Sequence, residues 1–194
     1  MSSSKRRIAY VTGGMGGIGM AIAEHLARTV RAKLVLVSRS PFPPQTEWTQ
    51  WTNAHDDRDA TTIGIRKIQA LTAMGAEVLV LNADIADLDQ MQAVRDRLYQ
   101  TFGELHGIFH AAGVLGDGIM QIKAPETAAG VMRPKVQGTL VLHQIFGATT
   151  LDFWVLFSSL SAVLGGLGQV DYCAANCFLD AFARSQASNQ QQRI

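Results

Sequence analysis

The residues best suited to ligand chemistry lie near the N-terminus, where a strand-like run, a glycine-rich loop and a helix-like run follow one another. The loop reads Thr-Gly-Gly-Met-Gly-Gly-Ile-Gly over Thr12–Gly19, between the apolar run Ile8–Val11 and the helical pattern of Met20–Ala27. Glycine costs backbone entropy, so this density indicates positive φ angles and backbone that a ligand can approach closely. A helix that begins at such a loop presents free N–H groups and a partial positive charge, which suit a pyrophosphate. We therefore predict a dinucleotide site, with a simple tight turn as the alternative, at Gly13, Gly14, Met15, Gly16, Gly17, Ile18 and Gly19.

A second set of chemically capable side chains lies toward the C-terminus. Ser159 follows an apolar strand pattern, and Tyr172 and Asn176 lie four residues apart on one face of an expected helix. Lys135 belongs to a single long helix expected over 131–146. Each residue also has an ordinary alternative, because serines often follow strands, tyrosines often sit half-buried at helix starts and lysines usually face water.

Alternating strand and helix patterns indicate how the fold positions these residues. Beyond the first strand, near-continuous apolar runs predict strands of a parallel sheet covered on both faces, at Lys33–Ser38, Glu77–Asn82, His106–His110 and Asp152–Phe157. Amphipathic helices are expected between them, for example over 62–75 and 91–102. With 194 residues, 47% of them hydrophobic, the chain can bury a substantial core. We predict an α/β fold with a doubly wound parallel sheet, in a chain whose length is that of about one domain.

Residues at the carboxyl ends of these strands are expected to line the ligand crevice. The second strand ends at Ser38 and Arg39, and an arginine at this place suits the 2′-phosphate of NADPH, although it could be an ordinary exposed loop residue. After the third strand, Asp84, next to Ile85, could accept a hydrogen bond from adenine, cap the following helix, or do both. The fourth strand runs into small residues that leave room for a nicotinamide ribose, at His110, Ala111, Ala112 and Gly113.

The segment 40–62 interrupts the alternation of strands and helices. It contains three prolines, a cluster of charged residues, and Trp48 and Trp51. A connection of this length is uncommon inside a compact domain. We predict a surface insertion that is partly helical, anchored by its two tryptophans, and not involved in catalysis.

Composition argues against several other classes of protein. A net charge of +1 provides no broad field for nucleic acid, so we expect no nucleic-acid partner. No apolar run is long enough for a membrane span, and the N-terminus lacks the apolar core of a secretory signal, so a cytoplasmic location without membrane association is expected. Cys173 and Cys177 are spaced unlike a redox motif or a zinc site, which predicts two small buried thiols and no metal.

Taken together, these motifs resemble the short-chain dehydrogenase/reductase superfamily: the glycine loop, the His-Ala-Ala-Gly run, and a serine followed thirteen residues later by a tyrosine. More narrowly, Phe157-Ser158-Ser159 and Gly168-Gln169-x-x-Tyr172-x-Ala174-Ala175-Asn176-x-Phe178-Leu179-Asp180 resemble the ketoreductase domain of modular polyketide synthases, over about residues 7–184. Most members of the superfamily have a lysine where this chain has Asn176. In the synthase ketoreductases the lysine lies instead on the preceding helix, where this chain has Lys135.

The resemblance implies a Rossmann fold and the NADPH-dependent reduction of a β-ketoacyl thioester, carried by an acyl carrier protein, to its β-hydroxyacyl form within a multidomain synthase. Tyr172 would be the proton donor and Ser159 would orient the carbonyl oxygen. Lys135 would lower the pKa of the tyrosine, and Asn176 would hold the lysine or an ordered water in a relay. The cofactor would supply the hydride.

The same resemblance leaves two functional alternatives and one open detail. Such ketoreductases continue with a further strand and a lid, which we expect to be absent here. Residues 1–194 would then be the NADPH-binding catalytic part of a ketoreductase domain, truncated after the helix that follows the fifth strand. A nucleotide-binding scaffold without turnover is therefore the first alternative. A free-standing short-chain carbonyl reductase is the second, and the Lys135 and Asn176 arrangement disfavours it. For the alcohol configuration, the run Leu115-Gly116-Asp117 and the residue Leu164 favour the ketoreductase class that carries a Leu-Asp-Asp motif.

Overall fold

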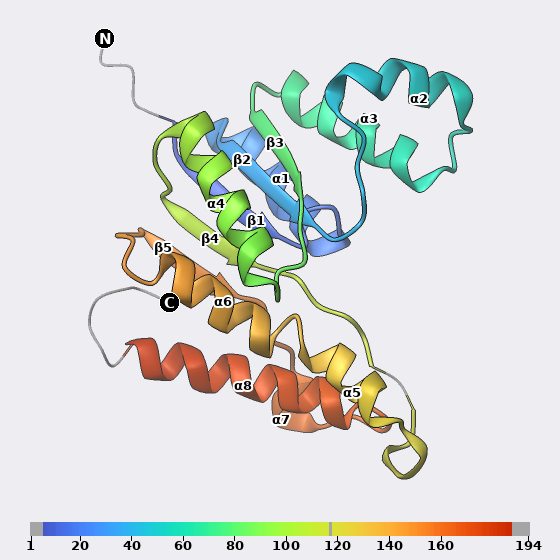
Figure 1. Cartoon of the computed structure of the whole chain (residues 1–194), viewed down its shortest axis with the longest axis vertical. Coiled ribbons are helices and arrows are strands. Elements are labelled where there is room, and N and C mark those ends of the chain that lie inside the picture. Colours follow the sequence, from blue (N-terminus) through green and yellow to red (C-terminus); the bar gives the residue numbers. More distant parts are fainter. Residues whose placement is uncertain (1–5, 117, 188–194) are drawn as a thin grey trace.

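The computed structural model describes residues 6–116 and 118–187, which are built around one parallel β-sheet. Its strands are β1 (Ile8–Thr12), β2 (Lys33–Ser38), β3 (Glu77–Asn82), β4 (Gly107–His110) and β5 (Phe153–Leu156), each end within one residue of its predicted bound. They pair in the order β3-β2-β1-β4-β5, all in parallel (Figure 1). The chain builds the sheet outward from β1 in one direction and then in the other, as in a doubly wound sheet. The predicted fold class is confirmed.

Helices make the connections between the strands. Two of them begin at aspartate caps: Asp59 accepts a hydrogen bond from the Thr62 N–H, and Asp87 accepts one from the Gln90 N–H. The helices are α1 (Gly17–Val30), α2 (Trp48–Ala54), α3 (Ala60–Ala73), α4 (Leu88–Phe102), α5 (Pro125–Met132), α6 (Val136–Phe146), α7 (Ser161–Leu164) and α8 (Val170–Ala187), with short turns η1 (Gln45–Glu47) and η2 (Met120–Ile122).

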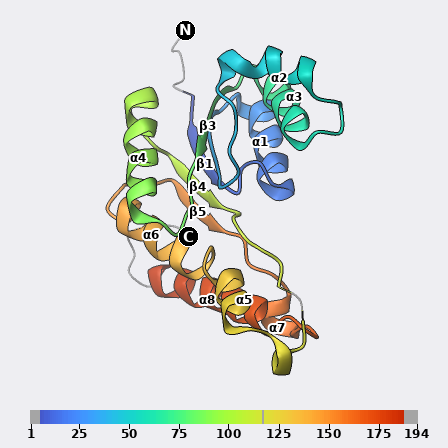
Figure 2. The same ribbon diagram turned by 45° about the vertical axis from the view of Figure 1, so that its right-hand side comes forward.

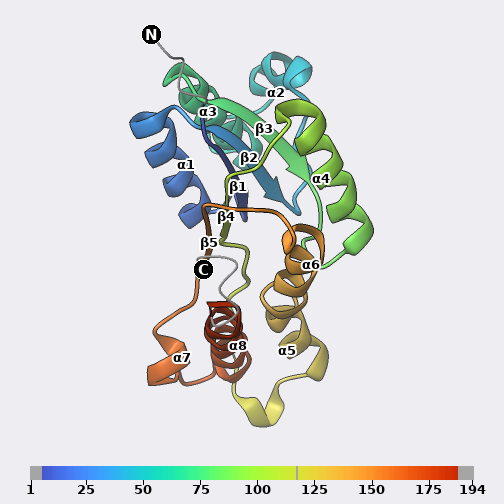
Figure 3. The same ribbon diagram turned by 90° about the vertical axis from the view of Figure 1, so that its left-hand side faces the viewer.

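The helices cover both faces of the sheet (Figure 3). α1 and α3 pack on one face, where Leu34 and Leu36 point, and α4 and α6 pack on the other, where Val35 and Val37 point. Successive side chains of a strand alternate between faces, so a strand that is buried on both sides must be apolar throughout. This requirement explains the near-continuous apolar runs in the sequence.

The expectation of one long helix over 131–146 is wrong. α5 ends at Met132 and α6 begins at Val136, with a turn between them. Pro134 lies in this turn, and a proline inside a helix removes a hydrogen bond and clashes with the preceding turn. As a result, Lys135 is the N-cap residue of α6 and not a residue in the middle of a helix.

The insertion 40–62 folds as η1 and α2, which pack beside α3 (Figure 1). Trp48 is buried, and its Nε1 donates to the Pro43 carbonyl at 2.9 Å. The Trp51 Nε1 donates to Asp59 Oδ1, also at 2.9 Å. Both hydrogen bonds lie within the insertion. Its attachment to the rest of the domain comes from apolar packing, because Trp48 belongs to the core cluster of α1, α3 and β2 and Trp51 packs against that cluster.

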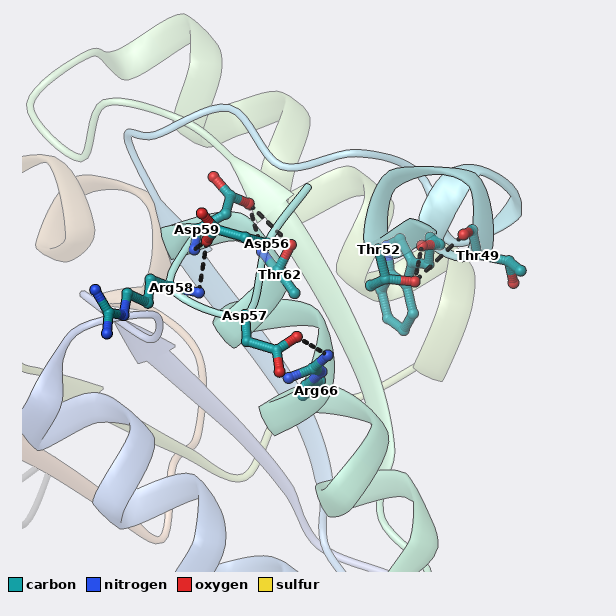
Figure 4. Close-up of polar contacts among 9 residues, drawn as sticks. Thr49, Thr52, Asp56, Asp57, Arg58, Asp59, Thr62 and Arg66 are labelled. Atoms are coloured by element: carbon teal, nitrogen blue, oxygen red, sulfur yellow. Dashed lines mark hydrogen bonds and ion pairs between the residues drawn. The ribbon is translucent and has the colours of Figure 1, made fainter. Parts of the chain in front are cut away.

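Aspartates shape the turn between α2 and α3 (Figure 4). The Asp56 carboxylate accepts from the backbone N–H groups of Arg58 and Asp59, at 2.8 and 3.0 Å. Asp57 forms an ion pair with Arg66 at 2.6 Å, with the two side chains 79% and 51% exposed. These polar contacts thus hold the turn between α2 and α3, on the outer side of the insertion.

The helix α8 lies side by side with α5 and α7, away from the centre of the sheet (Figure 2). The expectation that both cysteines are buried is wrong, since Cys177 is exposed and Cys173 is only half-buried. The buried positions of α8 are occupied instead by Asp171, Ala175, Asn176, Leu179 and Phe182.

Candidate active site

The glycine loop joins β1 to α1, as predicted, and several of its glycines let the chain pass close to itself. Gly13 has a φ of +64°, and a Cβ added there would lie 2.8 Å from the Ala111 carbonyl oxygen. A Cβ on Gly19 would collide with the Gly13 carbonyl oxygen. Gly17, in contrast, has open space where a Cβ would lie, and the neighbouring Ile18 is 54% exposed. The loop therefore packs against the segment after β4 and leaves the first turn of α1 accessible to a ligand.

A cleft of about 280 Å³ opens beside this loop, where the carboxyl ends of β1 to β4 meet. Parallel doubly wound sheets bind their ligands at this edge. The cleft is lined by eight residues that were predicted to bind the cofactor: Gly13, Met15, Gly16, Ser38, Arg39, Ile85, Ala112 and Gly113. Six further lining residues were not predicted to bind the cofactor: Thr12, Val37, Ser40, Ala83, Val114 and Pro134. Gly14 lies on the protein side of the loop, donating to the Val37 carbonyl at 3.1 Å.

The turn that presents Arg39 to the cleft is held by a residue that the sequence analysis missed. Asn82, at the end of β3, donates from Nδ2 to the carbonyl oxygens of Ser38 and Arg39, at 3.1 and 2.7 Å. Asn82 faces Ser38 in the register of β2 with β3. The two residues lie 44 positions apart in the sequence, so their contact can be inferred only from the pairing of β2 with β3.

Asp84 is half-buried after β3, and its carboxylate is engaged with the protein. Oδ1 accepts from the Ala86 N–H at 2.9 Å, and Oδ2 lies 3.2 Å from the Arg133 guanidinium. The alternative that Asp84 caps the next helix is wrong, because the N-cap residue of α4 is Asp87. Its neighbour Ile85 lines the cleft.

His110 is fully buried at the end of β4. Its Nδ1 lies 2.7 Å from Thr12 Oγ1, which also accepts from the Ala112 N–H at 3.3 Å. Burial lowers the pKa of His110 to about 3, the positive charge of Lys135 acts in the same direction, and the Pro134 carbonyl opposes both. The imidazole is therefore neutral near pH 7, and it ties the end of β1 to the segment that lines the cleft.

Lys135 lies beside Tyr172. Its Nζ is 5.8 Å from the centroid of the Tyr172 ring and donates to the Phe157 carbonyl at 2.7 Å. Its Cε lies 3.2 Å from the point where Gly113 would carry a Cβ, so the side chain packs behind a residue that lines the cleft. Lys135, Tyr172, Ser159 and Asn176 are not themselves among the lining residues of the cleft. Burial lowers the pKa of Lys135 to about 8, although the negative charge of Asp180 acts against this shift. The amine is thus mostly protonated at neutral pH, and it loses its proton more readily than the amine of an exposed lysine.

Asn176 lies one helical turn after Tyr172 and is fully buried. Its Nδ2 donates to the Tyr172 carbonyl at 2.7 Å, whereas Oδ1 has no hydrogen-bond partner among the described residues. A buried acceptor without a partner costs about 1–3 kcal/mol, so such atoms usually hold a water or a ligand group.

Ser159 is half-buried two residues before α7, and its Oγ accepts from the Ser161 N–H at 3.2 Å. The residues just before it are tied to both sides of the site. The Phe157 carbonyl accepts from Lys135, and Ser158 Oγ donates to the Asn176 carbonyl at 3.4 Å. The strand end that carries Ser159 therefore passes between the lysine and α8.

Three other predictions from the sequence concern the alcohol configuration, membrane association and metal binding. Asp117 lies outside the described residues, and Leu164 is exposed on α7. Over residues 6–116 and 118–187, every helix is too short or too polar to cross a bilayer. Within the same residues, no three His, Cys, Asp or Glu side chains gather as a metal site would require.

This geometry can support a specific kind of chemistry. A cleft with a helix N-terminus on one side and a cationic residue at the end of β2 suits a phosphorylated dinucleotide. A buried ammonium next to a phenol can stabilise negative charge on that phenol during proton transfer.

Comparison with known proteins gives consistent matches. Residues 8–194 match the family model described as the KR domain. The chain is 38% identical over 183 residues to a 6-methylsalicylic acid synthase of Arthrobotrys oligospora, a match that covers 92% of this chain and 10% of that protein. The chain thus spans about a tenth of the length of this relative.

Solved structures show the same likeness. An N-terminal ketoreductase from the macrolactin assembly line superposes with a TM-score of 0.82 and 37% identity, over 100% of this chain and 36% of that one. A 3-oxoacyl-[acyl-carrier protein] reductase from Brucella melitensis, solved in complex with NAD, superposes with a TM-score of 0.76 and 25% identity, over 96% of this chain and 69% of that one.

Proposed function

The chain belongs to the KR domain family, the ketoreductase family of polyketide synthases, and we propose that it reduces a β-ketoacyl thioester to the β-hydroxyacyl form with NADPH. The thioester would be carried by an acyl carrier protein of the same synthase. The name of one solved relative, a 3-oxoacyl-[acyl-carrier protein] reductase, supports this class of substrate. The partners of the chain would be this carrier and the remaining domains of the synthase.

One observation carries the proposal: the buried Lys135 amine lies 5.8 Å from the centre of the Tyr172 ring, and its side chain packs against Gly113, which lines the cleft. Burying an ammonium is costly unless its charge is used or paired. The Phe157 carbonyl satisfies one of its hydrogens, and the Asp180 carboxylate favours its charged form. A cation held here can act on the phenol and on a substrate oxygen bound beside it.

In this proposal the cofactor supplies the hydride, and the protein supplies position and a proton. Tyr172 donates the proton to the oxygen of the ketone, where negative charge develops. Ser159 donates a hydrogen bond to the same oxygen and fixes its place. Lys135 stabilises the phenolate that remains after proton transfer. Asn176 offers its unpaired Oδ1 to a water that returns a proton to the site.

The residues around the cleft fit NADPH. α1 begins at Gly17, directly after Gly16 in the lining of the cleft, and the free N–H groups of its first turn would hold a pyrophosphate. Arg39 and Ser40 line the end of the cleft at β2, and Asn82 holds their backbone in place. A guanidinium suits the 2′-phosphate that distinguishes NADPH from NADH.

A nucleotide-binding scaffold without turnover is the competing function, because the cleft alone would satisfy it. A free-standing carbonyl reductase of the same superfamily is a weaker alternative. The positions of Lys135 and Asn176 support the synthase type, since most of the superfamily carries its lysine one turn after the tyrosine.

The test compares binding with turnover. NADPH binding is followed by cofactor fluorescence, and turnover by loss of NADPH absorbance with a β-ketoacyl thioester mimic. Both are measured on this chain and on the chain fused to the C-terminal part of a solved ketoreductase. We expect both proteins to bind NADPH and the fusion to turn over. NADPH binding without turnover in either protein would favour the scaffold and contradict the reductase.

A further inference from the structure

A buried ion pair lies beside Tyr172 and takes no part in the proton transfer proposed above. Lys123 Nζ is 2.8 Å from both carboxylate oxygens of Asp171, and the two side chains are only 4% and 1% exposed. In each of the other ion pairs of the described residues, at least one side chain is 43% or more exposed. Removing two charges from water is costly for each ion, so a buried pair is weak evidence for stability and calls for another explanation.

The pair joins two segments that lie far apart in the sequence. Lys123 follows η2 and also donates to the Gly168 carbonyl at 3.1 Å, while Asp171 lies in the first turn of α8. Asp171 Oδ1 accepts a further hydrogen bond from the backbone N–H of Tyr172, at 2.9 Å. A Cβ on Gly116 would lie 2.7 Å from the same oxygen, so the segment before η2 also packs against this carboxylate.

Asp171 is held in its charged form. Burial acts to raise the pKa of this carboxyl, but the hydrogen bonds from Lys123 and Tyr172, with the positive charge of Lys123, lower it overall. A carboxylate near the N-terminus of α8 also interacts favourably with the helix dipole. One oxygen of this charged group therefore holds both the lysine and the backbone of Tyr172.

Apolar packing on the other side of α8's first turn is sparse. Gly165 and Gly168, with φ of +75° and +74°, make the chain that leads into it. Large apolar side chains along this approach face solvent: Val163, Leu164 and Leu167 are 81%, 79% and 98% exposed. The segment that leads into the turn carrying Tyr172 thus gains little hydrophobic burial from these side chains, and the ion pair is a strong local constraint at this end of α8.

We propose that the Lys123–Asp171 pair is a positioning device for Tyr172, which fixes the first turn of α8 against the segment after β4 and so sets the phenol relative to Lys135. Lys123 and Asp171 are positioning residues, because they act through the backbone of Tyr172. The inference rests on the proposed catalytic role of Tyr172. It predicts that breaking the pair changes the environment of one tyrosine while the cleft stays intact.

The chain suits a direct measurement of this environment, because it contains only three tyrosines: Tyr10, Tyr99 and Tyr172. Incorporation of fluorotyrosine gives three fluorine resonances, and Tyr172→Phe assigns the relevant one. Tyr10 is buried in the core and Tyr99 lies on α4, so their signals report on the rest of the fold. Arg66→Met, which breaks the exposed pair with Asp57, is the matched control (Figure 4).

Three variants separate an effect on the position of Tyr172 from an effect on the stability of the fold. Lys123→Met leaves a buried carboxylate unpaired and should be the least stable. Lys123→Met with Asp171→Leu replaces the pair by apolar groups and should recover stability, but it removes the acceptor of the Tyr172 N–H. Asp171→Asn keeps that acceptor and should largely preserve the Tyr172 signal. We expect the Tyr172 resonance to shift in the double variant, while Tyr10, Tyr99 and the affinity for NADPH stay unchanged.

Turnover provides the second measurement, in whichever protein of the preceding test is active. The double variant should lose roughly 10- to 100-fold in kcat, because small displacements of a reacting group cost this much, and its KM should change far less. A Tyr172 resonance at the parent's position in the folded double variant would overturn the inference. An inactive parent would count against the proposed reductase alone, since the fluorine signals decide the positioning role without turnover.

Discussion

At the scale of single residues, the proposed chemistry depends most on Lys135. Its amine is buried, yet it contacts a carbonyl and a phenol ring and does not form an ion pair at hydrogen-bonding distance among the described residues. Burial lowers its pKa to about 8, against an ordinary value of 10.5. Keeping the Lys135 amine charged near neutral pH therefore lowers the stability of the fold. Side chains with such shifted pKa values are typical of functional sites.

This arrangement makes the pH dependence of Lys135→Met a specific test. Between about 8 and 10.5 the unfolded chain binds more protons than the folded chain, so the free energy of unfolding should rise as pH increases through this interval. The rise should be smaller in Lys135→Met, which has no amine to discharge. Turnover of the parent should fall over the same interval, because the ammonium is lost. Denaturant unfolding and initial rates measured across this range check both effects.

The control for this prediction is Lys67→Met, which removes an exposed lysine from α3. It should keep the parent's dependence of stability on pH. If the parent and Lys135→Met show the same slope between about 8 and 10.5, folding does not lower the pKa of Lys135, and the account of its burial is contradicted.

At the scale of elements, two irregular segments determine which residues reach the site: the turn between α5 and α6, and the insertion 40–62. Pro134 breaks the helix and places Lys135 at the start of α6, next to Gly113. The insertion begins with Ser40, which lines the cleft, and continues into η1 and α2, held by Trp48. Both irregular elements therefore contribute directly to the walls of the cleft.

The insertion leads to a prediction about Trp48→Ala. Trp48 belongs to the core shared by α1, α3 and β2, so this change should lower the free energy of unfolding by about 3–5 kcal/mol. Trp51→Ala should cost less, since Trp51 is only half-buried. Affinity for NADPH should fall in Trp48→Ala, because the chain around Ser40 loses its support. Urea unfolding and fluorescence titration test this, and equal losses in the two variants would contradict the assigned anchoring.

Regular elements could be predicted from the sequence, and contacts between distant segments could not. The apolar runs of β1 to β5 and the glycine loop are local signals, and they located the sheet, the cleft and most of its lining. Asn82 and Ser38 meet only because β3 pairs with β2, and Lys123 meets Asp171 across 48 positions. Such contacts leave no periodicity in the sequence. Pro134 is itself a local signal for a break, but the helical spacing of the residues around it predicts one continuous helix.

For the whole molecule, the order of strands explains why one cleft collects residues from four parts of the chain. The ends of β1, β2, β3 and β4 meet at one edge of the sheet, and β5 leads to Ser159 beside them. α8 then returns against α5 and α6 and brings Tyr172 to Lys135. The proposed nucleotide site and the proposed proton donor thus arise from a single topology, in a chain that belongs to the KR domain family.

The most direct test of this account is transfer of an isotopic label. NADPH carrying deuterium at the transferred position of its nicotinamide is mixed with a β-ketoacyl thioester mimic and the active form of the chain, and the product is analysed by mass spectrometry. We predict a β-hydroxyacyl thioester with deuterium on its β-carbon, and no such product from Tyr172→Phe, which should still bind NADPH. Labelled product formed equally well by Tyr172→Phe, or loss of NADPH binding in that variant, would contradict the role assigned to the phenol beside Lys135.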